Sequence, residues 1–225
     1  MNNNSKFRIQ KLNNKREIHH LRKDSRKGRE YLARRAEMLR AAERLFAEKG
    51  FHGATMLDLA KLSEFSVGTL YNFFKTKEEV YYTQLIEKLD LFHSKLGTEI
   101  NQHPPGLVQI LALIEASVKF FQENQDFFRI FIQERSTLEL SVGATPGKEL
   151  RKRYLVYIDL VAKVMAKAIK KGDIQKFNPL EIAYSLVGML NSFCAYWTMH
   201  PEPNELVSKV SFIYDLFIKG AGKRE

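Results

Sequence analysis

The chain has 225 residues, 44% of them apolar, and a formal net charge of +10, which suits one small and one medium-sized helical domain. Its single cysteine, Cys194, excludes an intramolecular disulfide framework and fits a reducing compartment. The longest apolar run of the C-terminal half, Leu186 to Trp197, is too short to cross a bilayer. The basic N-terminus has no apolar segment after it, so we expect a cytoplasmic protein without a secretion signal.

The positive charge is concentrated at the N-terminus. Residues 1–30 hold ten Lys or Arg and three acidic residues, whereas residues 31–100 hold ten of each sign. A segment this rich in Asn, Lys and Arg cannot bury enough apolar surface to fold alone, so residues 1–29 are expected to form a disordered basic arm. Two interpretations have equal weight. In the first, the arm contacts the phosphates or the minor groove of a nucleic acid. In the second, it is a solvated tail, or it follows an upstream start codon that the cell does not use.

A first helix is predicted from about Glu30 to Glu48. Lys49 and Gly50 end it, with a cation in the last turn and a glycine just past it. Its inward face repeats at steps of three and four residues and is expected to consist of Leu32, Ala36, Leu39, Ala42 and Phe46.

Residues 55–77 have the pattern of two short helices joined by a tight turn. Thr55 and Asp58 are spaced so that a hydroxyl and a carboxylate can cap one helix start reciprocally. Ser66 opens the second helix, and Thr76 opens a third in the same way. Three capped helix starts within so short a segment indicate a helix-turn-helix.

The second of these helices has an apolar and a polar face. Phe74, with either Val67 or Leu70, is expected to face inward. The outer face, which can hydrogen-bond phosphates or base edges, consists of Thr69, Tyr71 and Asn72.

Residues 35–50, RAEMLRAAERLFAEKG, followed by residues 55–77, resemble the DNA-binding domain of the tetracycline-repressor (TetR) family. The matching positions lie in register across three predicted helices: Arg35, Leu39, Ala42, Leu45, Phe46, Gly50, Phe51, Thr55, Leu59, Ala60, Ser66, Gly68, Thr69, Leu70, Tyr71, Phe74 and Lys77. Two positions depart from the family pattern, because Glu64 replaces the usual turn glycine and Ala54 a common threonine. A glutamate at a position that needs φ > 0 should strain the turn mildly.

The resemblance implies an all-α protein of two domains. Residues 30–76 would form a three-helix helix-turn-helix DNA-binding domain, and residues 77–225 a larger helical domain for effector binding and dimerisation. Within the first domain, the resemblance implies phosphate contacts, and the exposed polar positions add candidates for base contacts. The expected DNA-contacting set is Arg35, Thr55, Ser66, Val67, Gly68, Thr69, Tyr71, Asn72 and Lys77.

Several members of this set have a structural alternative. Val67 and Gly68 could instead serve packing, and these two interpretations have nearly equal weight for both residues. Ser66 and Thr69 could act as helix caps alone. Tyr71 could be a half-buried ring, and Lys77 a solvated lysine. Taken together and in register, the residues favour DNA contacts.

Beyond the helix-turn-helix, the pattern stays helical. A long helix from Thr76 to about Ile100 is expected to connect the two domains, and Pro104 with Pro105 breaks the pattern after it. Further helices are predicted at about 106–124, 126–139, 147–171, 179–199 and 204–219.

The C-terminal domain is rich in aromatic residues, which at helical spacing form core far more often than pocket. The resemblance implies a cavity among the middle helices, and the candidates for its lining are Phe128, Phe131, Tyr154 and Tyr157. Large apolar side chains favour a small hydrophobic effector of unidentified structure. No metal and no other cofactor are expected, because the histidines lack partners at ligand spacing.

The last two predicted helices combine small and large residues, as expected for helices that form a four-helix bundle between two subunits. The predicted interface consists of Gly188, Ser192, Phe193, Trp197, Val210, Tyr214 and Phe217. A two-fold homodimer would present two recognition helices to a palindromic operator.

The sequence therefore predicts a ligand-responsive transcriptional repressor that binds double-stranded DNA as a homodimer and is released by a small hydrophobic effector. The alternative is a DNA-bound adaptor of the same fold that recruits a protein partner without a small-molecule effector. An enzyme and a membrane partner are not expected, because no convergent catalytic set and no spanning segment stand out.

Overall fold

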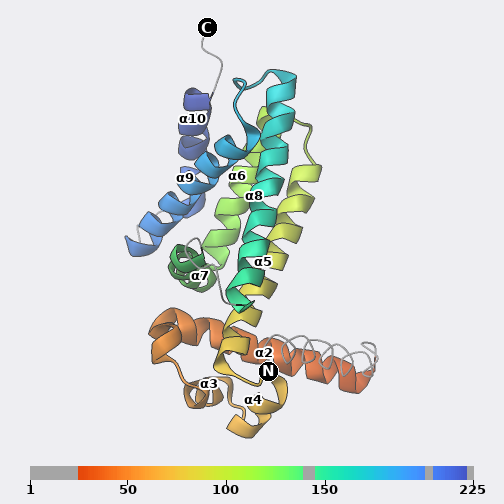
Figure 1. The fold of residues 1–225 in the computed structure, drawn as a ribbon, viewed down its shortest axis with the longest axis vertical. Coiled ribbons are helices and arrows are strands. Elements are labelled where there is room, and N and C mark those ends of the chain that lie inside the picture. Colours follow the sequence, from red (N-terminus) through yellow and green to blue (C-terminus); the bar gives the residue numbers. More distant parts are fainter. Residues whose placement is uncertain (1–24, 139–144, 201–204, 222–225) are drawn as a thin grey trace.

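The computed structural model describes residues 25–138, 145–200 and 205–221, and every regular element in these ranges is a helix. The all-α prediction is therefore confirmed. Figure 1 shows a small head formed by the first helices and a larger bundle that rises from it. Most of the basic arm lies outside the described residues, except that the first helix already begins at Arg26, four residues earlier than expected.

The head consists of α2 (Arg26–Gly53), α3 (Met56–Ser63) and α4 (Val67–Phe73). Gly50 has φ 68° and ψ 171°, so the regular helix is interrupted where the sequence predicts its end. The core of the head is formed by Leu39, Ala42, Leu45, Phe46, Leu59, Leu70 and Phe74.

The predicted inward face of α2 is wrong for its N-terminal half. Leu32 and Ala36 are exposed, whereas Leu39, Ala42 and Phe46 are buried as expected. The reason is that the covered face is rotated: Tyr31 stacks on Phe73, Arg35 lies over the Phe74 ring, and both are half-buried, so Leu32 and Ala36 lie on the side that faces solvent.

The larger bundle contains six α-helices and a short 3₁₀ helix among the described residues. In chain order these are α5 (Lys77–Asn101), α6 (Leu107–Glu123), α7 (Gln125–Leu138), α8 (Thr145–Lys171), α9 (Pro179–Met199), η1 (Leu206–Lys209) and α10 (Val210–Ala221). Each boundary lies within about two residues of the sequence prediction, apart from η1, which replaces the first turns of the last predicted helix.

Helix α5 leaves the head and becomes one wall of the bundle, where it packs along α6 and α8 (Figure 1). Its buried positions recur every three to four residues, from Val80 near the head to Ile100 at the far end. Helix α7 lies directly above α2 and packs against it, while α9 and α10 cover the other side of α6 and α8. The bundle and the head thus share α5 and also meet at α7.

The start of α6 is held against the end of α8 through a glycine. Gly106 has φ 117°, and a Cβ built on it would lie 2.1 Å from Oδ2 of Asp173. That carboxylate forms an ion pair with Lys171, with 3.3 Å between the nitrogen and the oxygen. Only a residue without a side chain fits this close approach.

Two glycine-to-alanine substitutions should therefore have opposite effects on stability. Gly106→Ala should lower the free energy of unfolding by about 1–3 kcal/mol, because it combines backbone strain with a clash. Gly97→Ala, inside α5 with no atom within 4 Å of the added Cβ, should raise it by about 0.5–1 kcal/mol. Urea unfolding of both variants measures the difference, and equal effects would contradict the account of this junction.

Candidate nucleic-acid interface

The first helix of the helix-turn-helix is capped as the sequence predicts. The Thr55 hydroxyl accepts from Asp58 N at 3.1 Å, and Asp58 Oδ2 accepts from Thr55 N at 3.0 Å. Hydrogen bonds from Thr55, together with the Lys49 ammonium 3.0 Å from Oδ1, lower the pKa of Asp58 to about 2. Asp58 is consequently ionised at neutral pH and fixes the start of α3.

The turn between α3 and α4 contains the strained residue that the sequence predicts. Glu64 has φ 59° and ψ 22°, in the left-handed region, and is the only non-glycine residue with positive φ in the described ranges. A glutamate tolerates this conformation at a modest cost, because its side chain points into solvent. The turn therefore keeps its geometry without the usual glycine.

Helix α4 presents its polar side chains to solvent. Leu70 and Phe74 are buried, whereas Gly68, Tyr71 and Asn72 are exposed. Val67, the other candidate for the inner face, is only half-buried, so Leu70 is the inward residue of the first turn. The helix is too short to be stable alone, so the buried pair holds the exposed face in position.

The start of α4 is closed by a double contact between two of the predicted phosphate ligands. The Ser66 hydroxyl accepts from Thr69 N at 3.1 Å, and the two hydroxyl oxygens are 2.8 Å apart. Ser66 therefore caps the start of α4. At this exposed end of the helix, free hydroxyl lone pairs and the positive end of the helix dipole still face solvent. At the other end of α4, the Phe73 ring stacks on Tyr31 of α2, with 4.5 Å between the centroids.

Arg35 and Lys77 are held by the protein itself. Arg35 lies 2.7 Å from a carboxylate oxygen of Glu87 on α5, and its guanidinium carbon lies 5.6 Å from the centroid of the Phe74 ring. Lys77 donates to the carbonyl oxygens of Phe51 and Ala54 at 2.7 and 2.9 Å. These contacts tie α2 to the start of α5, and the role of both cations in DNA binding stays a prediction.

One connection between the head and the bundle has no signal in the sequence. Lys88 of α5 lies 3.0 Å from a carboxylate oxygen of Glu43 on α2, and it donates to Oδ1 of Asn124 at 2.8 Å. Asn124 is the residue between α6 and α7, and its side-chain nitrogen donates to Phe120 O. The three partners are distant in sequence, so no spacing rule could have joined them.

All four predicted effector-pocket residues lie in the interior of the bundle. Phe128, Phe131, Tyr154 and Tyr157 are at most 5% exposed. Phe131 lies 6.1 Å from Tyr154, and Tyr157 lies 5.0 Å from Phe92 on α5, both measured between ring centroids. The residues are thus parts of one aromatic core, and their contact with an effector stays a prediction.

The predicted dimer residues differ in exposure. Phe217 is 7% exposed and packs into the core of its own chain, while Ser192 is exposed and the other five are half-buried. The predicted set lacks the large apolar residues that are most exposed on the last two helices. These are Leu180, Tyr184, Tyr196 and Met199 on α9, with Phe212 and Leu216 on α10.

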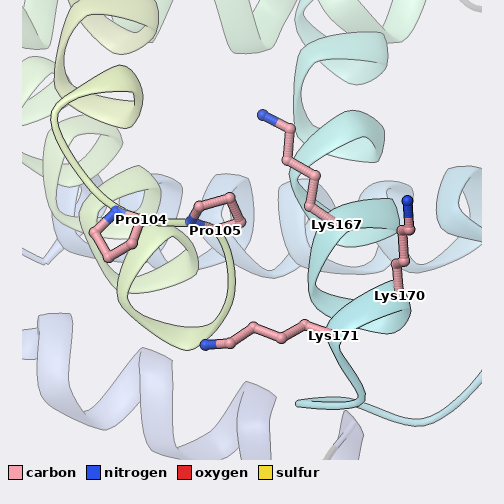
Figure 2. A pocket seen from close by; sticks show the side chains of 5 residues that line it. All are labelled: Pro104, Pro105, Lys167, Lys170 and Lys171. Atoms are coloured by element: carbon pink, nitrogen blue, oxygen red, sulfur yellow. The ribbon is translucent and has the colours of Figure 1, made fainter.

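A groove with a volume of about 520 Å³ lies at the end of the bundle away from the head. It is lined by Pro104 and Pro105 and by three lysines of the last turns of α8, Lys167, Lys170 and Lys171; Figure 2 shows the Lys171 side chain extending toward the prolines. Cations in the last turn of a helix interact favourably with the negative end of the helix dipole, which accounts for the position of these lysines. No helix in the described residues has the length and hydropathy needed to cross a membrane, and no cluster of potential metal ligands is found in that part.

A family model described as bacterial regulatory proteins, tetR family, matches residues 38–81, which span the end of α2, α3, α4 and the start of α5. The matched segment of the chain is thus a tetR-family DNA-binding segment. As the resemblance implies, the chain is a transcriptional regulator with a helix-turn-helix DNA-binding domain.

Similarity to other regulators extends beyond the matched segment. The fatty acid metabolism regulator protein of Bacillus subtilis (strain 168) is 22% identical over 187 residues, which cover 82% of this chain and 93% of the relative. Two solved structures share the fold. One is FadR from Bacillus subtilis in complex with stearoyl-CoA (TM-score 0.72, 17% identity, 82% of this chain and 98% of the other). The other is AibR in complex with isovaleryl coenzyme A and operator DNA (TM-score 0.71, 17% identity, 81% and 97%).

Substitution of Asn72 tests the polar face of α4. Asn72→Ala should weaken binding to a selected operator by about 1–3 kcal/mol, because an exposed Asn on a recognition helix can form two hydrogen bonds with adenine. Asn101→Ala, at the exposed far end of α5, is the matched control and should change nothing. Fluorescence anisotropy with labelled duplexes measures both affinities. Equal affinities for the two variants would exclude Asn72 from the interface.

Proposed function

We propose that this regulator is a repressor that binds a palindromic operator as a homodimer and leaves it when a fatty acyl thioester of coenzyme A binds in the bundle. The observation that carries the DNA-binding part is the geometry of α4, which buries Leu70 and Phe74 and exposes Tyr71 and Asn72 at a capped helix-turn-helix. Each subunit of a dimer can place one helix of this kind in the major groove of its half-site.

The exposed apolar surface of α9 and α10 supports the homodimer. On α9, Tyr184, Gly188, Ser192 and Tyr196 are spaced by four residues and share one face of the helix. Small residues between large ones allow two copies of the helix to approach closely. Together with Phe212 on α10, this face exposes three aromatic side chains, and a second copy would bury them.

The effector class is supported by the relatives and by the interior of the bundle. FadR was solved with stearoyl-CoA and AibR with isovaleryl coenzyme A, so regulators of this fold accept acyl chains of very different length. The interior of this chain is built from aromatic and aliphatic side chains of α5, α6, α7 and α8. Such an interior favours the hydrocarbon part of a ligand and disfavours a charged one.

Selection of bound duplexes from random DNA, with and without palmitoyl-CoA, tests this proposal. A palindromic motif should emerge, and palmitoyl-CoA should weaken its binding by at least about tenfold, within the usual range of coupling between two sites. Coenzyme A without an acyl chain is the control and should have a much smaller effect. If no motif emerges and binding depends only on salt, the operator-specific function is wrong.

Charged substitutions on the exposed apolar surface test the homodimer. Phe212→Asp combined with Tyr196→Asp should give monomers, because two carboxylates would be buried without partners in the interface. Val156→Asp, on an exposed position of α8, is the control and should remain dimeric. Sedimentation velocity distinguishes the two states. A dimeric Phe212→Asp/Tyr196→Asp variant would show that the subunits associate through another surface.

A further inference from the structure

Polar side chains from several helices meet in the otherwise aromatic interior of the bundle. Tyr157 of α8 is 4% exposed, and its hydroxyl is close to Ser117 of α6 and Cys194 of α9. Its ring lies 6.3 Å from His93 of α5 and nearly parallel to it. Asn191 precedes Cys194 by three residues, and so lies on the same face of α9.

Three of these buried groups have no hydrogen-bond partner of good geometry among the described residues. They are Nε2 of His93, the Tyr157 hydroxyl and the side-chain nitrogen of Asn191, and the last two are certain donors on residues that are 4% exposed. The neighbouring Ser117 hydroxyl donates to Leu113 O at 2.7 Å, and it does not meet the Tyr157 hydroxyl in hydrogen-bond geometry. Buried polar groups without partners destabilise a folded protein, and those that persist call for an explanation.

The chemistry of these groups restricts the ligand that could satisfy them. The fully buried polar residues of the described chain are Ser63, Gln84, Gln109, Ser117 and Asn191, and none of them carries a charge. Burial also raises the pKa of Tyr157, so its hydroxyl stays a neutral donor at physiological pH. Two neutral donors fit an uncharged acceptor such as a carbonyl oxygen, whereas a free carboxylate would be buried here without a cationic partner.

We propose that Tyr157 and Asn191 donate hydrogen bonds to the carbonyl oxygen of the effector's thioester, while the surrounding rings contact its acyl chain. This assignment rests on the proposed function, and it names the residues that recognise the polar end of the buried part of the ligand. In the free protein the two donors are unsatisfied, and effector binding supplies their acceptor. The ligand thus gains affinity from groups that weaken the free protein.

Tyr157→Phe separates this role from a structural one, because it removes the hydroxyl and keeps the ring. The melting temperature of the free variant should be equal to that of the wild type or higher by a few degrees, since an unsatisfied group is lost. Binding is then measured by calorimetry with palmitoyl-CoA and with S-hexadecyl-CoA, a thioether that lacks the carbonyl oxygen. The wild type should prefer palmitoyl-CoA by about tenfold, and Tyr157→Phe should abolish this preference.

Asn191→Leu should give the same pattern, with a similar melting temperature and a reduced preference for the thioester. Ile158→Val is the matched control, because Ile158 is buried next to Tyr157 and has no polar atom. This substitution should lower the melting temperature by a few degrees and leave the preference unchanged.

Three results would overturn the assignment, and they differ in what else they affect. If the wild type binds neither ligand, the proposed effector class fails together with the inference. If both ligands bind equally to the wild type, the effector class stands, but the protein donates no hydrogen bond to the thioester carbonyl. A clear drop in the melting temperature of Tyr157→Phe, with the preference retained, would show that the hydroxyl is satisfied inside the free protein and serves packing.

Discussion

Helix α5 belongs to both the head and the bundle, so the position of the head relative to the bundle depends on this one helix. Its first residue, Lys77, donates to two carbonyl oxygens at the end of α2, while Leu89, Phe92 and Leu96 lie in the bundle core. A helix transmits a shift or rotation along its length, because its backbone hydrogen bonds resist bending. Any ligand that moves the middle of α5 against α6 and α8 must therefore also move the head.

A second connection makes the position of the head sensitive to α6 and α7. Helix α7 packs on α2, and Lys88 joins Glu43 of α2 to Asn124 at the α6–α7 corner. Partly exposed ion pairs of this kind contribute little to the free energy of unfolding, so this one serves mainly to orient α2 relative to α5 and the α6–α7 corner. The head is thus held at two places that are both next to the predicted effector region, which is what an allosteric regulator needs.

Local patterns were sufficient to predict the helices, the caps and the left-handed turn at Glu64, because each depends on residues a few positions apart. The exposure of Leu32 was mispredicted since periodicity identifies an apolar stripe and not the partner that covers it. Long-range contacts had no signal: Arg35 pairs with Glu87, and Phe217 packs inside its own chain. Residues for DNA contact could be proposed from the family resemblance, whereas the unsatisfied donors of the interior became visible only in three dimensions.

The central claim is that operator and effector sites are coupled through α5 and α7. By thermodynamic linkage, the operator must weaken effector binding by the same factor by which the effector weakens operator binding. The most direct measurement is the affinity of palmitoyl-CoA for the protein alone and for the protein saturated with its operator. The account predicts weaker binding, by at least about tenfold, to the DNA-bound form. Equal affinities for the free and DNA-bound protein would contradict it.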